Sequence, residues 1–319
     1  MKRALPQKVD MRFPCTRIIL AAWTLLWLTL TSCSTNPYTD RWQLQMLPQS
    51  YLNQLGAQSY LQVKNDPKVT LSKDPREIEP VQRVAKRIIQ AAKQSKYAET
   101  ADTFEWEVNV IKDDKTLNAW ALPGGKIAVY TGIFPIAKNE AGLAAIMGHE
   151  VTHALAGHGG ERMSQGVVAQ VLLTGAAVAV QSSGAGAGTS QAVMQALGLG
   201  TQVGVLLPFS RKHESEADYI GMLLAAQAGY DPQEAVRVWE RMEQAGGSQP
   251  AEFMSTHPSH GTRIKQLQEW MPEALGYYEQ APHAPPAPDL PAIGRGRGAQ
   301  GATSPPQSQQ FRKNSKDGK

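Results

Sequence analysis

The amino-acid sequence predicts an α+β fold that is mainly helical, with a small β-sheet and a helical hairpin insertion. Three observations indicate this fold. Several long segments carry apolar residues at helical spacing, one short region alternates apolar and polar residues, and two apolar arms rich in Ala and Gly flank a flexible loop. About 240 of the 319 residues lie between atypical ends, which is enough for one sizeable domain.

The N-terminal residues resemble a secretory signal peptide. A basic stretch precedes an apolar run from Ile18 to Leu30, which is too short for a comfortable transmembrane span. The run continues into Leu30-Thr31-Ser32-Cys33, which resembles a bacterial lipobox in which Cys33 becomes the lipidated first residue. We therefore expect a lipoprotein signal peptide over residues 1–32 and a lipid-anchored linker over residues 33–46.

The residues near this expected lipidation site also predict a location. Ser34, rather than Asp, resembles the pattern that is sorted to the outer membrane of a Gram-negative bacterium, facing the periplasm. Cys15 lies inside the leader, so the mature chain would keep only Cys33 and would form no disulfide. The sequence leaves open whether the chain starts at Met1 or at Met11.

Two helices and three strands are expected in the first half of the domain. Residues 47–63 are weakly amphipathic, and residues 78–92 carry apolar side chains at i, i+3 and i+4 spacing. Residues 104–110 alternate, as a strand with one buried face does. Two shorter strands, near 117–122 and 126–131, are joined by a Pro-Gly-Gly turn.

A helix expected over residues 141–156 carries the most informative motif, His149-Glu150-Val151-Thr152-His153. Positions i and i+4 share one face of a helix, so His149 and His153 can both direct an imidazole at one Zn²⁺. Glu150 lies beside them, close enough to take a proton from a water at the metal. The rest of this helix is almost free of charge, which predicts that it is buried and that its polar side chains need partners.

A catalytic zinc needs a third protein ligand and an open position for water. One class of zinc peptidases places a third histidine six residues after the motif, but that position is Gly159. A second helix expected over residues 210–227 offers Glu214 instead, with His213 as a weaker rival.

Asp218 follows Glu214 by four residues and therefore shares a face of the second helix with it. Asp218 can accept the second N–H of a ligand imidazole, as carboxylates behind metal-bound histidines do. Glu216 points elsewhere on the helix and is expected to be a solvated charge.

These motifs resemble the zinc metallopeptidase family of the CaaX prenyl proteases, HtpX and BepA, and most of all its periplasmic lipoprotein members. The resemblance covers residues 36–272. Besides the motif on the first helix, it rests on Asn118-Ala119-Trp120-Ala121-Leu122-Pro123-Gly124-Gly125, Ile127-Ala128-Val129-Tyr130-Thr131-Gly132, His158 with Arg162, Ser210-Arg211-Lys212-His213-Glu214-Ser215-Glu216-Ala217-Asp218, and Ser255-Thr256-His257-Pro258 with Arg263-Ile264.

The resemblance implies a zincin-like (gluzincin) metallopeptidase domain over residues 47–280 that binds one Zn²⁺ per chain. It assigns the metal to His149, His153 and Glu214, the base to Glu150, and the support of a ligand ring to Asp218. His257 would be either an occasional fourth ligand that plugs the site or a donor to the oxyanion of the transition state, and Arg263 is a second candidate for such a donor. The alternative for His257 is a helix-start residue before Pro258.

The strand before the active helix is expected to bind substrate. In zinc peptidases such an edge strand faces the active helix and pairs with the backbone of the substrate. We expect Asn118, Ala119, Trp120 and Ala121 to form it. A hairpin that only covers the core is the alternative.

Residues 164–207 are expected to form an apolar helical hairpin between the two metal-binding helices. Its arms, near 166–180 and 192–207, are shorter than the ~20 residues that a membrane span needs. We expect this hairpin to pack on the domain or to line the cleft. A spanning hairpin would instead make the chain an integral inner-membrane protease.

The C-terminal part begins with a helix start at Asp231-Pro232-Gln233-Glu234, and another helix is expected over residues 259–271. Residues 281–319 are rich in Pro, Gly, Ser and Gln and predict a disordered basic tail. The leader and this tail each contribute +4 to the formal net charge of +4, so residues 33–280 carry −4. We therefore expect no nucleic-acid partner.

The predicted function is that of a zinc-dependent endopeptidase of the bacterial cell envelope. By the family resemblance, its substrates would be unfolded, misfolded or misassembled periplasmic and outer-membrane proteins, and the membrane would be contacted through the lipid anchor. The alternative is a non-catalytic or autoinhibited chaperone or assembly lipoprotein on the same fold. An intact Glu150 argues against it, because a closed structural zinc site has no use for a base.

Overall fold

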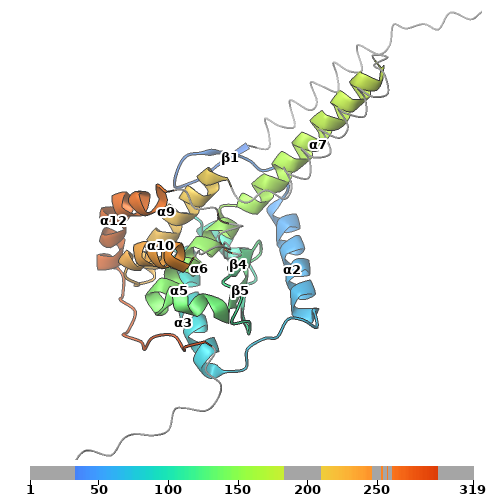
Figure 1. Ribbon diagram of the computed structural model, residues 1–319. Coiled ribbons are helices and arrows are strands. Elements are labelled where there is room, and N and C mark those ends of the chain that lie inside the picture. Colours follow the sequence, from blue (N-terminus) through green and yellow to red (C-terminus); the bar gives the residue numbers. More distant parts are fainter. Residues whose placement is uncertain (1–32, 183–209, 246–252, 254–256, 258–260, 294–319) are drawn as a thin grey trace, which may run out of the picture.

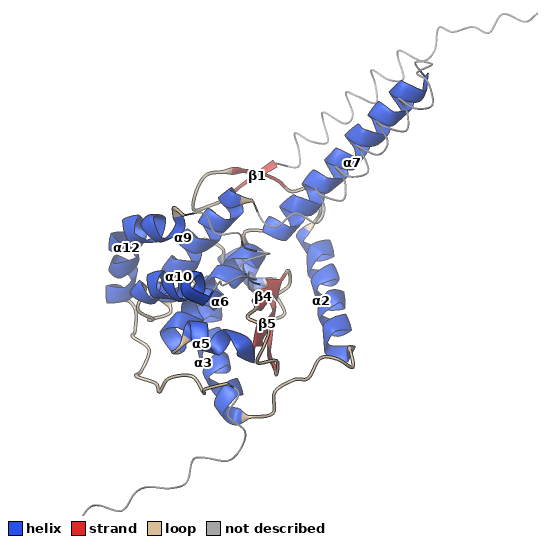
Figure 2. Cartoon of the chain, viewed as in Figure 1, coloured by secondary structure: helices blue, strands red, loops and turns tan. Residues whose placement is uncertain are grey.

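The computed structural model describes residues 33–182, 210–245, 253, 257 and 261–293 (Figure 1). The expected signal peptide, the loop and second arm of the hairpin, and residues 294–319 lie outside the described residues. Helices surround one small sheet (Figure 2). The described helices are α2 (Gln49–Asn65), α3 (Pro75–Ala92), α4 (Ala98–Asp102), α5 (Phe134–Ala137), α6 (Glu140–Leu155), α7 (His158–Ser182), α9 (Arg211–Gln227), α10 (Gln233–Ala245) and α12 (Arg263–Gln280), with one 3₁₀ turn, η1 (Thr131–Ile133).

The central sheet has three strands in the order β3 (Glu107–Ile111), β5 (Lys126–Tyr130), β4 (Ala119–Leu122). β3 pairs with β5 in parallel, and β4 pairs with β5 antiparallel through a tight turn. Gly124 and Gly125 in that turn have φ of 84° and 80°, which only glycine adopts without strain. In the described part of the chain, β4 therefore lies at an edge of this sheet.

Helices cover both faces of the sheet. α2 packs on one face, where the Tyr60 hydroxyl donates to the backbone oxygen of Ile127 (3.0 Å). α3 and α6 pack on the other face, and their buried apolar side chains join those of α9 and α10 in the main core. The predicted mainly helical α+β fold is thus confirmed.

α6 lies in the middle of this core and begins at a cap. The Asn139 side chain accepts the N–H of Gly142, and the helix is buried along nearly its whole length. α9 crosses α6 and begins in the same way, with the Ser210 hydroxyl accepting the N–H of His213. The crossing brings the motif of α6 against the first turns of α9.

The N-terminal residues 33–46, which we expected to be a linker, are folded onto the domain. β1 (Cys33–Thr35) and β2 (Trp42–Leu44) form a two-stranded antiparallel ribbon. The side chains of Asn36 and Gln43 are buried. We call residues 33–46 the N-terminal strap. The Asn36 side chain accepts the N–H groups of Tyr38 and Thr39 within the strap, and Gln43 Nε2 donates to Ala156 O of the body. The expectation of a linker is wrong because such contacts are not revealed by a hydropathy pattern.

The C-terminal boundary also differs from the prediction. α12 continues to Gln280, through Pro272, where we expected it to end at Met271. Residues 282–293 pack on the body: the Ala284 N–H donates to Gly229 O (2.8 Å), and the Leu290 N–H donates to Lys138 O (2.9 Å). The prediction of a disordered tail from residue 281 is therefore wrong for this stretch.

α7 includes the first arm of the expected hairpin, but it starts at His158, directly after α6, and extends away from the domain (Figure 1). Its exposed apolar side chains include Val167 and Leu172. Among the helices that the structure describes, none combines the length and the apolar composition required to cross a membrane.

Candidate metal centre

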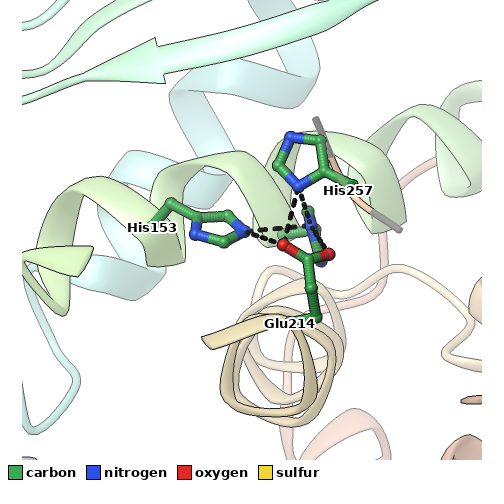
Figure 3. Close-up of side chains that lie close together, drawn as sticks. His153, Glu214 and His257 are labelled. Carbon is green, nitrogen blue, oxygen red and sulfur yellow. Dashed lines mark hydrogen bonds and ion pairs between the residues drawn. The ribbon is translucent and has the colours of Figure 1, made fainter. Parts of the chain in front are cut away.

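Four buried side chains meet where α6 and α9 cross. His149 and His153 come from α6 and Glu214 from α9, while His257 approaches from the C-terminal part of the chain. One ligand atom from each of the four lies within 4.8 Å of all the others. Figure 3 shows His153, Glu214 and His257 pointing toward one another. The residues expected to bind the metal are thus brought together, with His257 among them.

The distances are those of a closely packed cluster of ligand atoms. The Nε2 atoms of His149 and His153 are 3.1 Å apart. His149 Nε2 lies 3.5 Å from Glu214 Oε2, and His153 Nε2 lies 3.4 Å from Glu214 Oε1. His257 Nδ1 lies 3.0 Å from Glu214 Oε1 and 3.3 Å from His149 Nε2. Burial favours a higher pKa for Glu214, but the hydrogen bond from His257 and the nearby histidines outweigh it and lower the pKa.

Asp218 holds the ring of His149 from behind. Its Oδ1 lies 2.9 Å from His149 Nδ1, as the sequence predicted for a supporting carboxylate. Burial opposes ionisation of Asp218, but Arg263 and His149 overcome it and lower its pKa to about 2. His149 therefore donates Nδ1–H to a carboxylate and presents Nε2 to the cluster.

Arg263 holds this supporting carboxylate in place with two of its three guanidinium nitrogens. Its guanidinium pairs with both oxygens of Asp218 and lies 2.9 Å from Glu214 Oε2. It also stacks on the Trp239 ring at 3.5 Å. Its Nη1 has no hydrogen-bond partner among the described residues, so Arg263 stays a second candidate for an oxyanion donor.

The cluster fits Zn²⁺ on chemical grounds. His149 and His153 both turn Nε2 toward Glu214, so two imidazole lone pairs and a carboxylate converge on one point, as the ligands of a metal ion do. Burial and the neighbouring histidines hold the pKa of His153 well below its ordinary value, so its imidazole is neutral at neutral pH. Two imidazoles and a carboxylate are a ligand set that zinc accepts in catalytic sites.

Glu150 lies beside the cluster without belonging to it. Its Oε1 is 4.0 Å from His149 Nε2 and 3.6 Å from His257 Nε2, and it has no hydrogen-bond partner among the described residues. Burial raises the pKa of this carboxyl, and the surrounding histidines oppose the shift only in part. A buried carboxylate oxygen with no partner, next to ligand atoms, is suited to bind a water molecule.

Two neighbours differ from the sequence-based expectation. His213, the rival ligand, lies outside the cluster, with Nε2 3.0 Å from Glu161 Oε2. Glu216, expected to be a solvated charge, is 5% exposed and faces His158 Nε2 at 3.1 Å. That expectation is wrong because the N-terminal strap covers the side of α9 on which Glu216 lies.

β4 brings the expected substrate strand next to α6. The Tyr130 N–H donates to Asn118 O (3.1 Å), which shows which residues of β4 bond to β5 through their backbone. In an antiparallel ladder, the backbone N–H and C=O groups of alternate residues point to opposite sides of the strand. Those of Trp120 therefore point to β5, and those of Ala119 and Ala121 point to the open edge of the sheet. The side chain of Trp120 packs edge-on against Tyr60.

A helix carrying two histidines and a glutamate, a second helix carrying a third ligand, and an edge strand beside them define a zincin-like metallopeptidase. The sequence profile of Peptidase family M48 matches residues 75–271, and the chain belongs to this family. Glu150, His149 and His153 lie within the matched residues, as do Glu214 and Asp218.

Known metalloendopeptidases and a bacterial protease are similar to this chain in sequence. The mitochondrial metalloendopeptidase OMA1 of Schizosaccharomyces pombe is 42% identical over 196 residues, which cover 61% of this chain and 53% of the relative. The human mitochondrial metalloendopeptidase OMA1 is 30% identical over 281 residues, 84% of this chain and 51% of that protein. The beta-barrel assembly-enhancing protease of Escherichia coli K12 is 30% identical over 158 residues, 49% and 32% of the two chains.

The chain spans about half the length of the S. pombe and human relatives, 53% and 51%. Relatives from fungi, a plant and animals have mitochondrial names. They contradict the predicted location in a bacterial outer membrane, and that prediction is wrong. The prediction depended on a short lipobox-like motif that ends at Cys33 and on Ser34 after it, which are far less specific than matches that run through most of the domain.

Proposed function

We propose that the chain is a zinc-dependent endopeptidase that cleaves extended segments of misfolded or misassembled proteins. The observation that carries this proposal is the position of Glu150. It is a buried carboxylate outside the ligand set, and its Oε1 accepts no hydrogen bond among the described residues and lies 4.0 Å from one ligand nitrogen. A purely structural zinc site has no use for such a group.

The edge of β4 supports an extended substrate. Strand addition satisfies the outward backbone groups of Ala119 and Ala121 with backbone groups of the substrate. Main-chain hydrogen bonds do not depend on side chains, so one site can accept many sequences. Folded proteins rarely offer a free strand of this kind, whereas unfolded segments do.

The residues have separable tasks in peptide hydrolysis. His149, His153 and Glu214 would hold zinc, which supplies Lewis acidity at such a site. Glu150 Oε1 would take a proton from the attacking water and pass it to the leaving amine nitrogen. Its pKa, raised by burial, brings proton uptake closer to neutral pH. Asp218 keeps the His149 ring in the tautomer that presents Nε2.

His257 supports a resting state that is closed. Its Nδ1 lies within the ligand cluster, where a fourth protein ligand would occupy the position that water needs. The backbone N–H of His257 donates to Phe253 O (2.8 Å), and the Phe253 N–H donates to Leu117 O beside β4 (3.3 Å). We therefore favour the plug over the oxyanion donor.

The test is hydrolysis of an unfolded protein by the purified chain. We expect cleavage that a chelator stops and zinc restores. A set of peptide substrates, each with one backbone nitrogen methylated, tests strand addition. Losses should recur at every second residue, because alternate backbone groups of a strand face β4. A chain that binds zinc but cleaves neither substrate, even with His257 replaced by alanine, would favour the non-catalytic assembly factor instead.

A further inference from the structure

Arg41 of the N-terminal strap binds two buried glutamates at once. Its guanidinium donates to Glu216 from Nε and Nη2 (2.8 Å each) and to Glu161 from Nη1 and Nη2 (2.8 Å each). Glu161 belongs to α7 and Glu216 to α9, and the Thr39 hydroxyl adds a further bond to Glu216. One arginine therefore ties the strap to both helices that flank the metal centre.

The strap makes other contacts around the end of α6. Gln43 Nε2 donates to Ala156 O (2.9 Å), and Gln45 Nε2 donates to Gly157 O (3.0 Å). The Met46 N–H donates to the Ser164 hydroxyl (3.0 Å). These bonds fix the turn between α6 and α7, which directly follows the ligand His153.

A chain of hydrogen bonds leads from Arg41 to a metal ligand. Glu216 Oε2 lies 3.1 Å from His158 Nε2, and His158 Nδ1 lies 2.9 Å from His153 Nδ1. Glu216 is a carboxylate between an arginine and a hydroxyl, so it accepts the proton on His158 Nε2. His158 Nδ1 then accepts the Nδ1–H of His153. This tautomer leaves the lone pair of His153 Nε2 facing Glu214, 3.4 Å away.

Both ligand histidines are thus supported by a carboxylate that an arginine holds. His149 is supported directly by Asp218, which Arg263 binds. His153 is supported by Glu216 through the imidazole of His158. Arg41 binds Glu216 in the same way that Arg263 binds Asp218. Arg263 lies inside the residues matched to the family, and Arg41 lies outside them.

We propose that Arg41 is a positioning residue of the metal centre: it fixes Glu216, which through His158 holds the His153 ring in the tautomer and orientation that bind zinc. The inference rests on the proposed role of His153 as a ligand. Replacement of partners behind a metal-bound histidine costs about 10- to 100-fold in metal affinity. Arg41 should therefore change zinc affinity although it touches neither metal nor substrate.

The experiment measures zinc affinity of the full chain by competition with a chelator. Arg41→Ala is expected to bind zinc about 10- to 100-fold more weakly than the wild type. The matched control is Arg241→Ala. Arg241 has a similar side-chain exposure, 22% against 18%, and also bridges elements, through Ile136 O and Glu234. The control should stay within about twofold of wild-type affinity, even if both variants lose stability.

Further variants separate the relay from a general loss of folding. If Arg41 acts through His158, the double variant Arg41→Ala, His158→Ala binds zinc no more weakly than His158→Ala alone. Arg41→Lys keeps the charge but cannot engage two carboxylates as a fork, so it should lose part of the affinity while remaining folded. In a ¹⁵N NMR spectrum of the zinc-loaded wild type, His153 should carry its proton on Nδ1.

Unchanged affinity in Arg41→Ala, or in Arg41→Lys where the alanine variant does not fold, would overturn the proposal. Losses that multiply in the double variant would do the same. His153→Ala distinguishes this failure from failure of the site itself: zinc retained by His153→Ala refutes the ligand assignment, whereas zinc lost from His153→Ala but kept by Arg41→Ala refutes only the role of Arg41.

Discussion

Gly148 of α6 and Gly221 of α9 lie backbone against backbone where the two helices cross. A Cβ atom built on Gly221 would be 2.6 Å from the backbone nitrogen of His149, and one built on Gly148 would be 2.5 Å from Gly221 O. Neither position has room for a methyl group. The close crossing brings Glu214 and Asp218 within reach of the histidines, so helix spacing sets the geometry of the ligand cluster.

Gly221→Ala is expected to destabilise the protein by about 1–3 kcal/mol, because the added methyl forces α9 away from α6. Zinc affinity should fall as well, since Glu214 and Asp218 move with the helix. Thermal unfolding of the zinc-free protein and chelator competition measure the two effects. Gly276→Ala in α12 is the control: nothing lies within 4 Å of its added Cβ, so helix propensity should make it neutral or stabilising. A fully stable, zinc-tight Gly221→Ala would contradict this account.

Glu150→Gln is expected to keep zinc and fold and to lose about 10²- to 10⁴-fold in the rate of proteolysis, because it removes the base but no ligand. Zinc content and cleavage of an unfolded protein are the measurements. Glu140→Gln changes another buried glutamate of α6, one that pairs with Arg83 at 2.7 Å, and should keep its activity. Activity near wild type in Glu150→Gln would disprove its role as base.

Glu214→Ala is expected to lose zinc, since it removes the only ligand from α9. Glu234→Ala is the matched control, because Glu234 is also buried and paired, with Arg237 (2.8 Å) and Arg241 (2.9 Å). Metal analysis of both purified variants decides the matter. Glu216→Ala should retain zinc with reduced affinity, because it supports His153 only through His158. Zinc at full occupancy and wild-type affinity in Glu214→Ala would move the third ligand elsewhere.

His257→Ala is expected to keep zinc and to raise basal cleavage, because removal of a fourth protein ligand frees the position for water. The measurement is a rate on a zinc-loaded variant. A fall of about 10²- to 10³-fold with zinc still bound would instead identify His257 as the oxyanion donor. An unchanged rate would mean that His257 only starts a helix before Pro258.

The sequence predicts the helices that carry the ligands almost to the residue. The expected bounds, 141–156 and 210–227, differ by at most one residue from those of α6 (Glu140–Leu155) and α9 (Arg211–Gln227). Two ligands four residues apart then need only the helical repeat. The choice of Glu214 as the third ligand depended on which face of α9 points to the metal, and the four-residue spacing to Asp218 indicated that face. Local patterns thus give most of the ligand set.

The remaining parts depend on contacts between distant residues. Arg41 pairs with Glu161 and Glu216 across 120 and 175 positions, and no local pattern marks such a pair. α12 was expected to end before Pro272, but packing of Ala274, which is fully buried, outweighs the cost of a proline inside the helix. Tertiary burial decided both outcomes.

The two arginines behind the ligand histidines have a consequence for the order of events during synthesis. Arg41 emerges from the ribosome early, and Arg263 emerges more than two hundred residues later. Until α12 has docked, Asp218 lacks its counter-ion and His149 its fixed ring, so the growing chain cannot hold zinc tightly. A chain that ends before Arg263 should therefore bind zinc more weakly than one that includes α12, although it already contains His149, His153 and Glu214.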